Sequence, residues 1–213
     1  SEMVRMNRQT EIDGINESTV AADFLEAQFA IKNEVRTPGV LSLIVQYTIE
    51  HLDLARKSLI PAIFCGIPLG ILAFRYRRFG SVILGSVGII QTIPALALLV
   101  VLMPLVGQLG GQSIGTGSLT AVLALFLYSL LPIVRGTYTG LAGIEPYYLE
   151  SAEAMGLSSR FRLWNIELPL ATRSVLSGIK TAAVINVGYA TLGALIGAGG
   201  FGQPILTGIR LAD

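Results

Sequence analysis

Few side chains in this 213-residue chain could do chemistry, and the most versatile reactive types occur once each. His51 is the only histidine and Cys65 is the only cysteine. Sites that need two histidines or two cysteines are therefore excluded, and so is an internal disulfide. A lone histidine beside a membrane is most often an interfacial residue. The sequence predicts no catalytic residue and no metal site.

One glycine pattern, Gly197-x-Gly199-x-x-Gly202, matches the dinucleotide-binding fingerprint literally. That site requires a strand before the glycines, a helix after them and an acidic residue about 20 positions later. Here the glycines follow a long apolar segment, and no acid stands at that distance. We interpret them as a chain reversal or a close helix contact.

Polar side chains interrupt two apolar segments. Gln91, Thr92 and Pro94 lie in one of them, and Asn186 and Tyr189 share a helix face in the other. Polar groups are costly in hydrocarbon, so they usually face a bundle interior or a water-filled path. Pro94 also removes a backbone hydrogen bond and is expected to kink its helix. We predict that these five residues line a translocation pathway. An equally weighted alternative is hydrogen bonding between helices with no role in transport.

The stretch Glu150–Pro169 carries several charges within an otherwise apolar region. Tyr147–Met155 predicts a short helix, and Gly156 suits a left-handed cap at its end. Arg160 and Arg162 make the stretch basic, which favours the cytoplasmic side of a membrane. A short helix there is a candidate docking element. The alternative is a helix that only reverses the chain.

The elements that must position these residues are membrane helices. The chain is 52% hydrophobic and only 14% charged, with a mean hydropathy of +0.66. This composition predicts an all-α, multi-pass helix bundle, and the net charge of +1 argues against a nucleic-acid surface. Spanning requires about 20 apolar residues. Four segments approach or reach that length: 58–74, 82–106, 119–134 and 175–198.

The basic residues predict the topology. Arg75, Arg77 and Arg78 follow the first segment, and the basic stretch around Arg160 falls on the same side of the membrane. Arg56 and Lys57 fall on the other side, as a mild exception.

The first part of the chain has a different character. Residues 1–36 are rich in acids and predict one amphipathic helix behind a possible cap at Ser18. Residues 37–57 are expected to form a linker and an interfacial segment, since the run 40–49 is too short to span. Residues 58–213 are the expected transmembrane domain.

Six residues reproduce the spacing of a known motif, the EAA loop of type I ABC-importer permeases: Glu150, Ala152, Gly156, Ile166, Leu168 and Pro169. Ser151 stands where that motif usually has its first alanine. In that family the loop is the coupling helix, here at about 147–160, which docks in a cytoplasmic ATPase. The resemblance therefore assigns the six residues to ATPase coupling.

The resemblance implies a set of partners and a location. A second permease copy, making a homodimer, would complete the pathway, and an extracytoplasmic substrate-binding protein or domain would deliver the solute. ATP and Mg would be bound by the ATPase subunits, with no cofactor in this chain. The location would be the cytoplasmic (inner) membrane of a bacterium. The family normally has a further helix after residue 202, which we expect to be lacking here.

Two phrases narrow the resemblance. QTIPALAL, residues 91–98, is similar to the branch of these importers that carries osmoprotectant quaternary amines such as glycine betaine, choline or carnitine. MNRQTEIDGINESTVAADFL, residues 6–25, faintly resembles the C-terminal end of a binding domain that some of these importers fuse to the permease. Residues 1–36 would then be extracytoplasmic. Tyr128 and Tyr138 could attract a quaternary ammonium group, but we expect specificity to lie in the binding protein.

Other functions stay open. The permease could carry another small solute, or the chain could be a passive channel or a membrane scaffold. A channel would leave the charged loop without a purpose. A scaffold would not need polar residues inside its spans.

Overall fold

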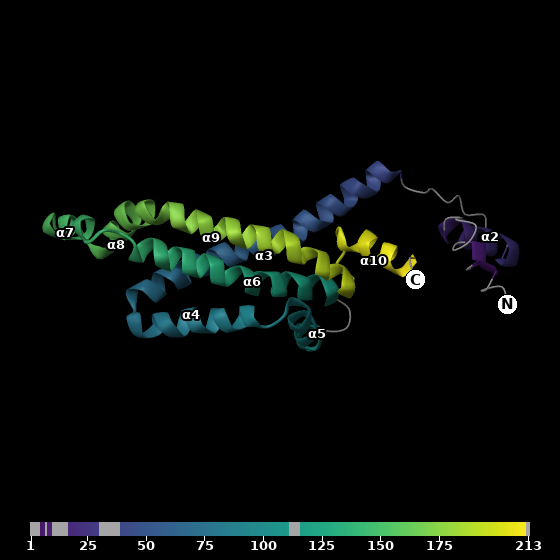
Figure 1. The fold of residues 1–213 in the computed structure, drawn as a ribbon, viewed down its shortest axis with the longest axis horizontal. Coiled ribbons are helices and arrows are strands. Elements are labelled where there is room, and N and C mark those ends of the chain that lie inside the picture. The colour runs from purple at the N-terminus through teal and green to yellow at the C-terminus, as the bar shows by residue number, and fades with distance from the viewer. Residues whose placement is uncertain (1–4, 7, 10–16, 30–38, 111–115, 212–213) are drawn as a thin grey trace. The chain divides into compact units, whose positions relative to one another are not determined.

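The computed structural model describes residues 5–6, 8–9, 17–29, 39–110 and 116–211 (Figure 1). These residues contain helices and no strand, which confirms the predicted all-α class. The chain divides into two compact units. One comprises Ser1–Gln46 and Thr207–Asp213, and the other, here called the main unit, is Tyr47–Leu206.

The first unit contains helix α2, Glu17–Phe29. A helix is therefore present where the sequence predicts one, beginning one residue before Ser18. Val20 is buried, whereas Phe29 at the last position is 64% exposed. Much of the remaining acidic segment, and residues 37–38 of the predicted linker, lie outside the described residues.

Helix α3, Val40–Arg75, is one continuous helix of 36 residues. The sequence predicts a separate interfacial segment before the first span, and the structure instead joins the two. Asp53 explains part of this continuity, because its carboxylate lies 2.8 Å from Arg56 Nη2 and 2.5 Å from Lys57 Nζ. Pairs three and four residues apart stabilise a helix. The same pairing offsets the positive charge that made this region an exception in the predicted topology.

The sequence predicts one span at 82–106, but the structure divides this segment between two helices. Helix α4, Arg77–Thr92, and helix α5, Ala95–Gly110, form an apolar pair bent by 101°. Ile93 is extended, with ψ 127°, because the residue before a proline is driven out of the helical region. The kink predicted at Pro94 is thus confirmed and is larger than a simple bend.

The other spans follow the sequence more closely. By length and composition, three continuous helical segments of the described chain could cross a membrane: Val40–Arg75, Gly117–Ala142 and Ser159–Ile196. Helix α6 is Thr116–Ala142, and it continues past the predicted end at residue 134. The last segment contains α8 (Ser159–Arg162), the π-helix η1 (Leu163–Glu167), α9 (Leu168–Tyr189) and the 3-10 helix η2 (Ala190–Ile196).

Glycines bring α3, α6 and α9 close together in the main unit, where α6 and α9 lie side by side (Figure 1). A Cβ atom added at Gly136 of α6 would lie 3.0 Å from the Cα atom of Gly178 in α9. One added at Gly70 of α3 would lie 2.5 Å from the Cβ atom of Thr137 in α6. Small residues permit this approach between membrane helices. Only glycine fits these contacts without displacing the partner helix.

The stretch 197–202 reverses the chain between η2 and helix α10, Gly202–Leu211. Gly197 and Gly200 have φ angles of 76° and 79°, which favour glycine. The Gly200 N–H donates to Glu50 Oε2 at 3.0 Å. The neighbouring His51 is buried, and its Nε2 lies 2.8 Å from the Val187 carbonyl oxygen. The chain reversal inferred from the glycines is confirmed. The histidine expected at the membrane interface is buried within the main unit, and its depth in the bilayer stays a prediction.

Candidate functional site

A short helix, α7, lies at one end of the α6–α9 pair (Figure 1). It runs from Pro146 to Ala154, close to the predicted bounds. Proline suits the first helical position because its missing N–H would have no partner there. Gly156 has a φ of 72° and ends the helix as the sequence predicts. The Leu157 N–H donates back to the Ala152 carbonyl at 3.1 Å and closes this cap.

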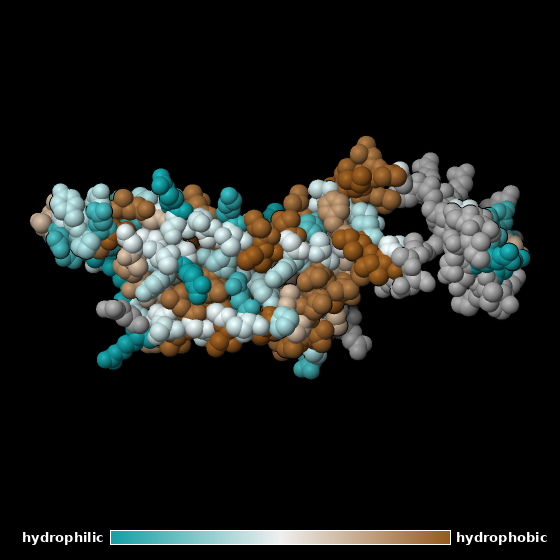
Figure 2. Space-filling view, in the orientation of Figure 1, coloured by the Kyte–Doolittle hydropathy of each residue, from teal (hydrophilic) through white to brown (hydrophobic). Residues whose placement is uncertain are grey.

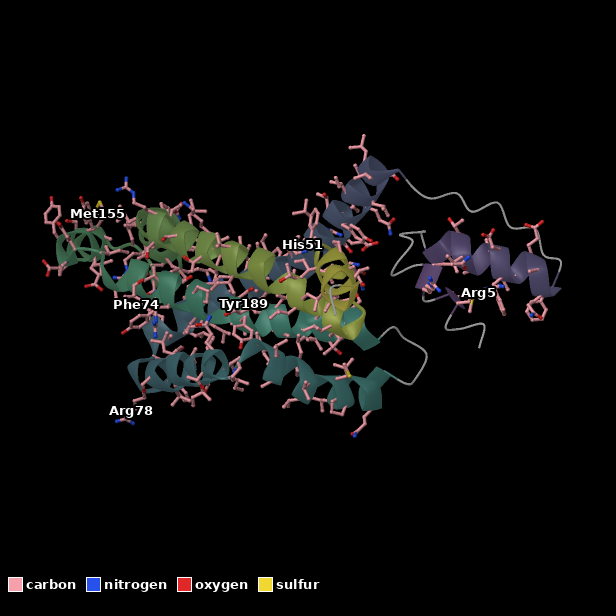
Figure 3. All side chains as sticks on the ribbon, turned by 45° about the vertical axis from the view of Figure 1, so that its right-hand side comes forward. Arg5, His51, Phe74, Arg78, Met155 and Tyr189 are labelled. Atoms are coloured by element: carbon pink, nitrogen blue, oxygen red, sulfur yellow. The ribbon has the colours of Figure 1, made fainter. Side chains whose placement is uncertain are left out.

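The two faces of α7 differ. Ala152 is fully buried against the rest of the main unit, whereas Glu150 is exposed. Tyr147 and Met155 are also exposed, at 70% and 67%. Figure 3 shows Met155 at the α7 end of the main unit, far along the helices from His51. Hydrophilic residues gather around this end in Figure 2. A carboxylate flanked by exposed apolar side chains is suited to contact with another protein.

Beyond Gly156 the chain enters α8, where Ser158 Oγ accepts from the Phe161 N–H at 3.3 Å as an N-cap. Ile166 and Leu168 are half-buried and Pro169 is exposed at the start of α9. Leu168 and Pro169 line an apolar groove together with Ile67 of α3. The structure thus places the first part of the motif on α7 and the second part against the spans. ATPase contact by these residues stays a prediction.

An ion cluster joins α7 to the spans. Arg162 Nη1 lies 2.7 Å from Glu153 Oε1, and Arg162 Nε lies 2.8 Å from Glu167 Oε1. Glu167 is only 1% exposed. Arg75 Nη1 stands 3.9 Å from Glu167 Oε1, and Arg75 Nη2 donates to the Ser159 carbonyl at 3.2 Å. The two basic clusters therefore meet at one end of the main unit, which confirms that they fall on one side.

Sequence reasoning missed Glu153 and Glu167. Arg162 and Glu167 are five residues apart, a separation that places two residues of an α-helix on different faces. The π-helix between them has wider turns, with hydrogen bonds between residues five apart, and so brings them together. The nearest signal is an acid between apolar residues in LWNIELP, two positions before a proline.

The polar residues of the second predicted span lie at the break between α4 and α5. Gln91 Nε2 donates to the Tyr128 carbonyl at 2.9 Å, and the Tyr128 hydroxyl donates to the Ile93 carbonyl. Thr92 Oγ1 bonds to a carbonyl within its own helix, and Pro94 is exposed. The break is thus held to α6 by two hydrogen bonds to main-chain carbonyls.

Asn186 and Tyr189 have different surroundings although they are three residues apart. Asn186 is fully buried, donates to Ser58 Oγ at 2.9 Å and accepts from Ser129 Oγ at 2.9 Å. It thereby joins α3, α6 and α9, as the hydrogen-bonding alternative describes. Tyr189 is 41% exposed and meets Tyr128 edge-on, with ring centroids 5.2 Å apart.

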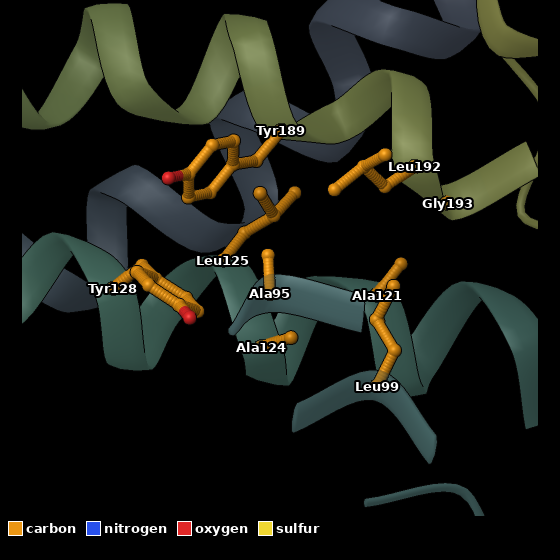
Figure 4. Close-up of a pocket in the computed structure, with 9 residues that line it drawn as sticks. All are labelled: Ala95, Leu99, Ala121, Ala124, Leu125, Tyr128, Tyr189, Leu192 and Gly193. Carbon is orange, nitrogen blue, oxygen red and sulfur yellow. The ribbon is translucent and has the colours of Figure 1, made fainter. Parts of the chain in front are cut away.

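These two tyrosines border a small apolar cavity (Figure 4). Its volume is about 10 Å³, room for one water at most. In this conformation it is too small to hold an organic solute.

A larger polar groove runs along α6 and α9 beside the end of α4. Its volume is about 410 Å³. Its polar side chains come from all three helices: Gln91, Arg135, Thr139, Ser174, Ser177 and Thr181. Of the five predicted pathway residues, only Gln91 lines the groove. Hydroxyl groups spaced along a helix give a weak sequence signal, because serine and threonine also bond to carbonyls in their own helix.

Comparison with known proteins gives consistent matches. Residues 62–213 match the family model described as "Binding-protein-dependent transport system inner membrane component". The chain is 44% identical over 165 residues to the glycine betaine/carnitine/choline transport system permease protein OpuCD of Bacillus subtilis, covering 78% of this chain and 69% of the relative. It is 40% identical over 166 residues to the osmoprotectant import permease protein OsmW of Salmonella typhimurium, covering 78% and 76%. Among solved structures it is similar to the inward-facing MetNI methionine ABC transporter, with a TM-score of 0.70, 25% identity, and coverage of 78% of this chain and 80% of that chain.

Proposed function

The chain belongs to the family of inner-membrane components of binding-protein-dependent transport systems, and from this premise we propose that it is the permease subunit of an ATP-driven osmoprotectant importer. Relatives at 37–44% identity are named as permeases for glycine betaine, carnitine and choline. We assign the same quaternary-amine solutes to this chain. Those names are the observation that carries the proposal, and the helical fold supports it.

The coupling role rests on α7. It is short, lies at the end of the main unit, and exposes Glu150 while burying Ala152. A separate ATPase that binds ATP and Mg docks on this exposed face. Movement of the ATPase then shifts α7 against the spans. A ligand can drive such a change only if its contacts differ between the two states, and those of Glu150 provide that difference.

The polar groove forms one wall of the pathway. Polar side chains in membrane helices usually face a water-filled path or another helix, and this groove is open in a single copy of the chain. A second copy closes it in a homodimer. Gln91, at the break between α4 and α5, is the predicted pathway residue that lines this groove. Asn186 instead hydrogen-bonds to Ser58 and holds the helices together.

The remaining assignments are proposed from the resemblance to the family. An extracytoplasmic binding protein or domain delivers the solute, and the location is the bacterial cytoplasmic membrane. We further propose that residues 1–36 are an extracytoplasmic segment derived from the end of such a fused domain. Residues 37–57 join it to the permease domain, 58–213, and most of this connection is continuous with the first span in helix α3. None of the six polar groove residues is aromatic, which agrees with solute selection by the binding protein.

The test is reconstitution of the chain with co-expressed ATPase subunits and binding protein in proteoliposomes. ATP-dependent uptake of radiolabelled glycine betaine, choline or carnitine is expected, with the ATPase bound stoichiometrically. Uptake without ATP would indicate a channel, and no uptake with no bound ATPase would indicate a scaffold. Uptake of only an unrelated solute would overturn the quaternary-amine assignment alone.

A further inference from the structure

The geometry points to Arg162 as the joint that carries movement of α7 into α3 and α9, a positioning role that rests on the proposed coupling function. The six motif residues account for docking of α7. They do not account for how its displacement passes beyond Gly156, where even an added Cβ atom would meet no neighbouring atom within 4 Å. Gly156 itself therefore takes no part in packing, and the side-chain contacts that tie α7 to the spans must lie elsewhere.

Arg162 makes that connection because two of its nitrogens serve different carboxylates. Its Nη1 holds Glu153 in the last turn of α7, and its Nε holds Glu167 immediately before α9. The guanidinium group is planar and rigid, so displacement of one carboxylate displaces the other. The Arg162 side chain is 12% exposed, and solvent therefore screens its inner contact only weakly.

The inner end of the joint is incompletely paired. Glu167 Oε2 is buried and has no hydrogen-bond partner among the described residues. Arg75, the last residue of α3, stands 3.9 Å from the other oxygen, beyond hydrogen-bond distance. A small movement of either helix brings this guanidinium group into contact with Glu167. The cluster can therefore exist in two arrangements, one with Arg75 apart and one with it bound.

The π-helix supplies a second element with two forms. Arg162 and Glu167 can pair only while Leu163–Glu167 keeps its wide turns, since an α-helix would separate residues five apart. A pull on Arg162 through Glu153 thus biases the form of this segment and the rotation of α9. Both sites act on one two-state element, which is the physical requirement for coupling.

The experiment measures whether α7 and α9 move together. Spin labels are placed at Met155 and Thr172, both exposed, in a Cys65→Ser background. Because Met155 lies on the proposed docking face, co-purification of the ATPase with the labelled chain is checked first. Distance distributions are recorded by electron–electron double resonance on the full complex with its ATPase, with and without ATP and vanadate. We expect one narrow distance distribution in each nucleotide state, because Arg162 holds α7 and α9 together in both arrangements of the cluster. Glu153→Ala should broaden the distribution at least twofold and lower uptake per ATP hydrolysed several-fold.

Two further variants make the test specific. Arg162→Lys should behave like Glu153→Ala, because one ammonium group cannot reproduce contacts made by two separated nitrogens. Glu145→Ala is the matched control: it removes the same group next to the other end of α7, where the side chain makes no cap hydrogen bond, and should resemble wild type.

The outcomes separate this inference from the proposed function. The role of Arg162 would be overturned if the distance distribution of Glu153→Ala were as narrow as that of the wild type, or if the wild-type distribution were already broad in either nucleotide state. A wild-type chain that purifies with no ATPase overturns the proposed function instead. The label distances are then recorded on the chain alone in nanodiscs. There, a broader distance distribution in Glu153→Ala than in the wild type still decides whether Arg162 tethers α7.

Discussion

Two polar clusters hold the main unit together, one charged and one neutral. The ion cluster consists of Glu153, Arg162, Glu167 and Arg75, and it reaches from solvent to a fully buried carboxylate oxygen. The amide cluster consists of Ser58, Ser129 and Asn186, all buried. In the amide cluster both serine hydroxyls also bond to carbonyls in their own helices, at 3.0 Å and 2.7 Å.

The difference separates a rigid contact from a movable one. The side chains of the amide cluster are paired with one another across α3, α6 and α9, so a movement that separated these helices would leave the buried Asn186 amide without partners. The ion cluster has one unpaired oxygen and one arginine just beyond contact. The two arrangements of the ion cluster, with Arg75 apart from Glu167 or bound to it, therefore differ less in free energy than the paired and unpaired forms of the amide cluster. The four predictions below test this contrast in order of decreasing effect.

Glu167→Ala should have the largest effect on stability. Removing one partner of a buried ion pair leaves an uncompensated charge, and we expect a loss of about 3 kcal/mol in the free energy of unfolding, near the lower end for such pairs because Arg162 keeps Glu153. Denaturation in mixed detergent micelles measures it. Glu145→Ala is the control, and an equal effect in both variants would contradict the buried role of Glu167.

Asn186→Leu should cost less, about 1–2 kcal/mol, because Ser58 and Ser129 retain their carbonyl acceptors. The same denaturation assay applies. Uptake per ATP hydrolysed should stay unchanged in the fraction that folds. Thr172→Val, an exposed change on the same helix, provides the comparison. If uptake per ATP hydrolysed fell in Asn186→Leu, the distinction between the two clusters would be removed.

Gly156→Ala should destabilise the α7 cap by about 1 kcal/mol, since a Cβ atom is disfavoured at a φ of 72°. Hydrogen exchange of the α7 amides should rise, while α9 stays protected. Gly188→Ala removes a glycine from a helix with open space around it and should be neutral or stabilising. If both variants opened α7 equally, the cap would not depend on the left-handed conformation.

Glu153→Ala should change stability least, by less than about 1 kcal/mol, because its side chain is 70% exposed. The change should shrink further in about 0.5 M salt, where the screening length is only a few ångströms. Thermal unfolding at two salt concentrations measures both effects. A large, salt-independent loss would show that the outer pair supports the fold, and the contrast with Glu167 would fail.

Local backbone chemistry made much of this structure predictable. Gly156 ended α7 where a left-handed cap was expected, and Pro94 marked the break between α4 and α5. The angle of 101° between α4 and α5 could not be predicted, because it depends on packing and on the hydrogen bonds that join Gln91 and Ile93 to the distant Tyr128. The join between the predicted interfacial segment and the first span was missed because each run was judged by hydropathy alone.

The site was predictable where a motif existed and not elsewhere. Glu150 and Ala152 stand on α7 as the motif implies. Glu167 was missed because a carboxylate in a basic stretch normally indicates a solvated surface. Its burial depends on a π-helical turn, for which the sequence offers no reliable signal. Asn186 was correctly singled out as costly in a membrane, but its partners lie 57 and 128 residues away in the chain.

The break between α4 and α5 bears on the lipid around the protein. Each helix has 16 residues and is therefore about 24 Å long, less than the hydrocarbon thickness of about 30 Å. Because they meet at 101°, they cannot add their lengths along the bilayer normal. If α4 stands upright, α5 lies nearly parallel to the membrane plane within a single leaflet. Acyl chains there must end against its side, so thinner bilayers should accommodate this edge of the protein better than thick ones.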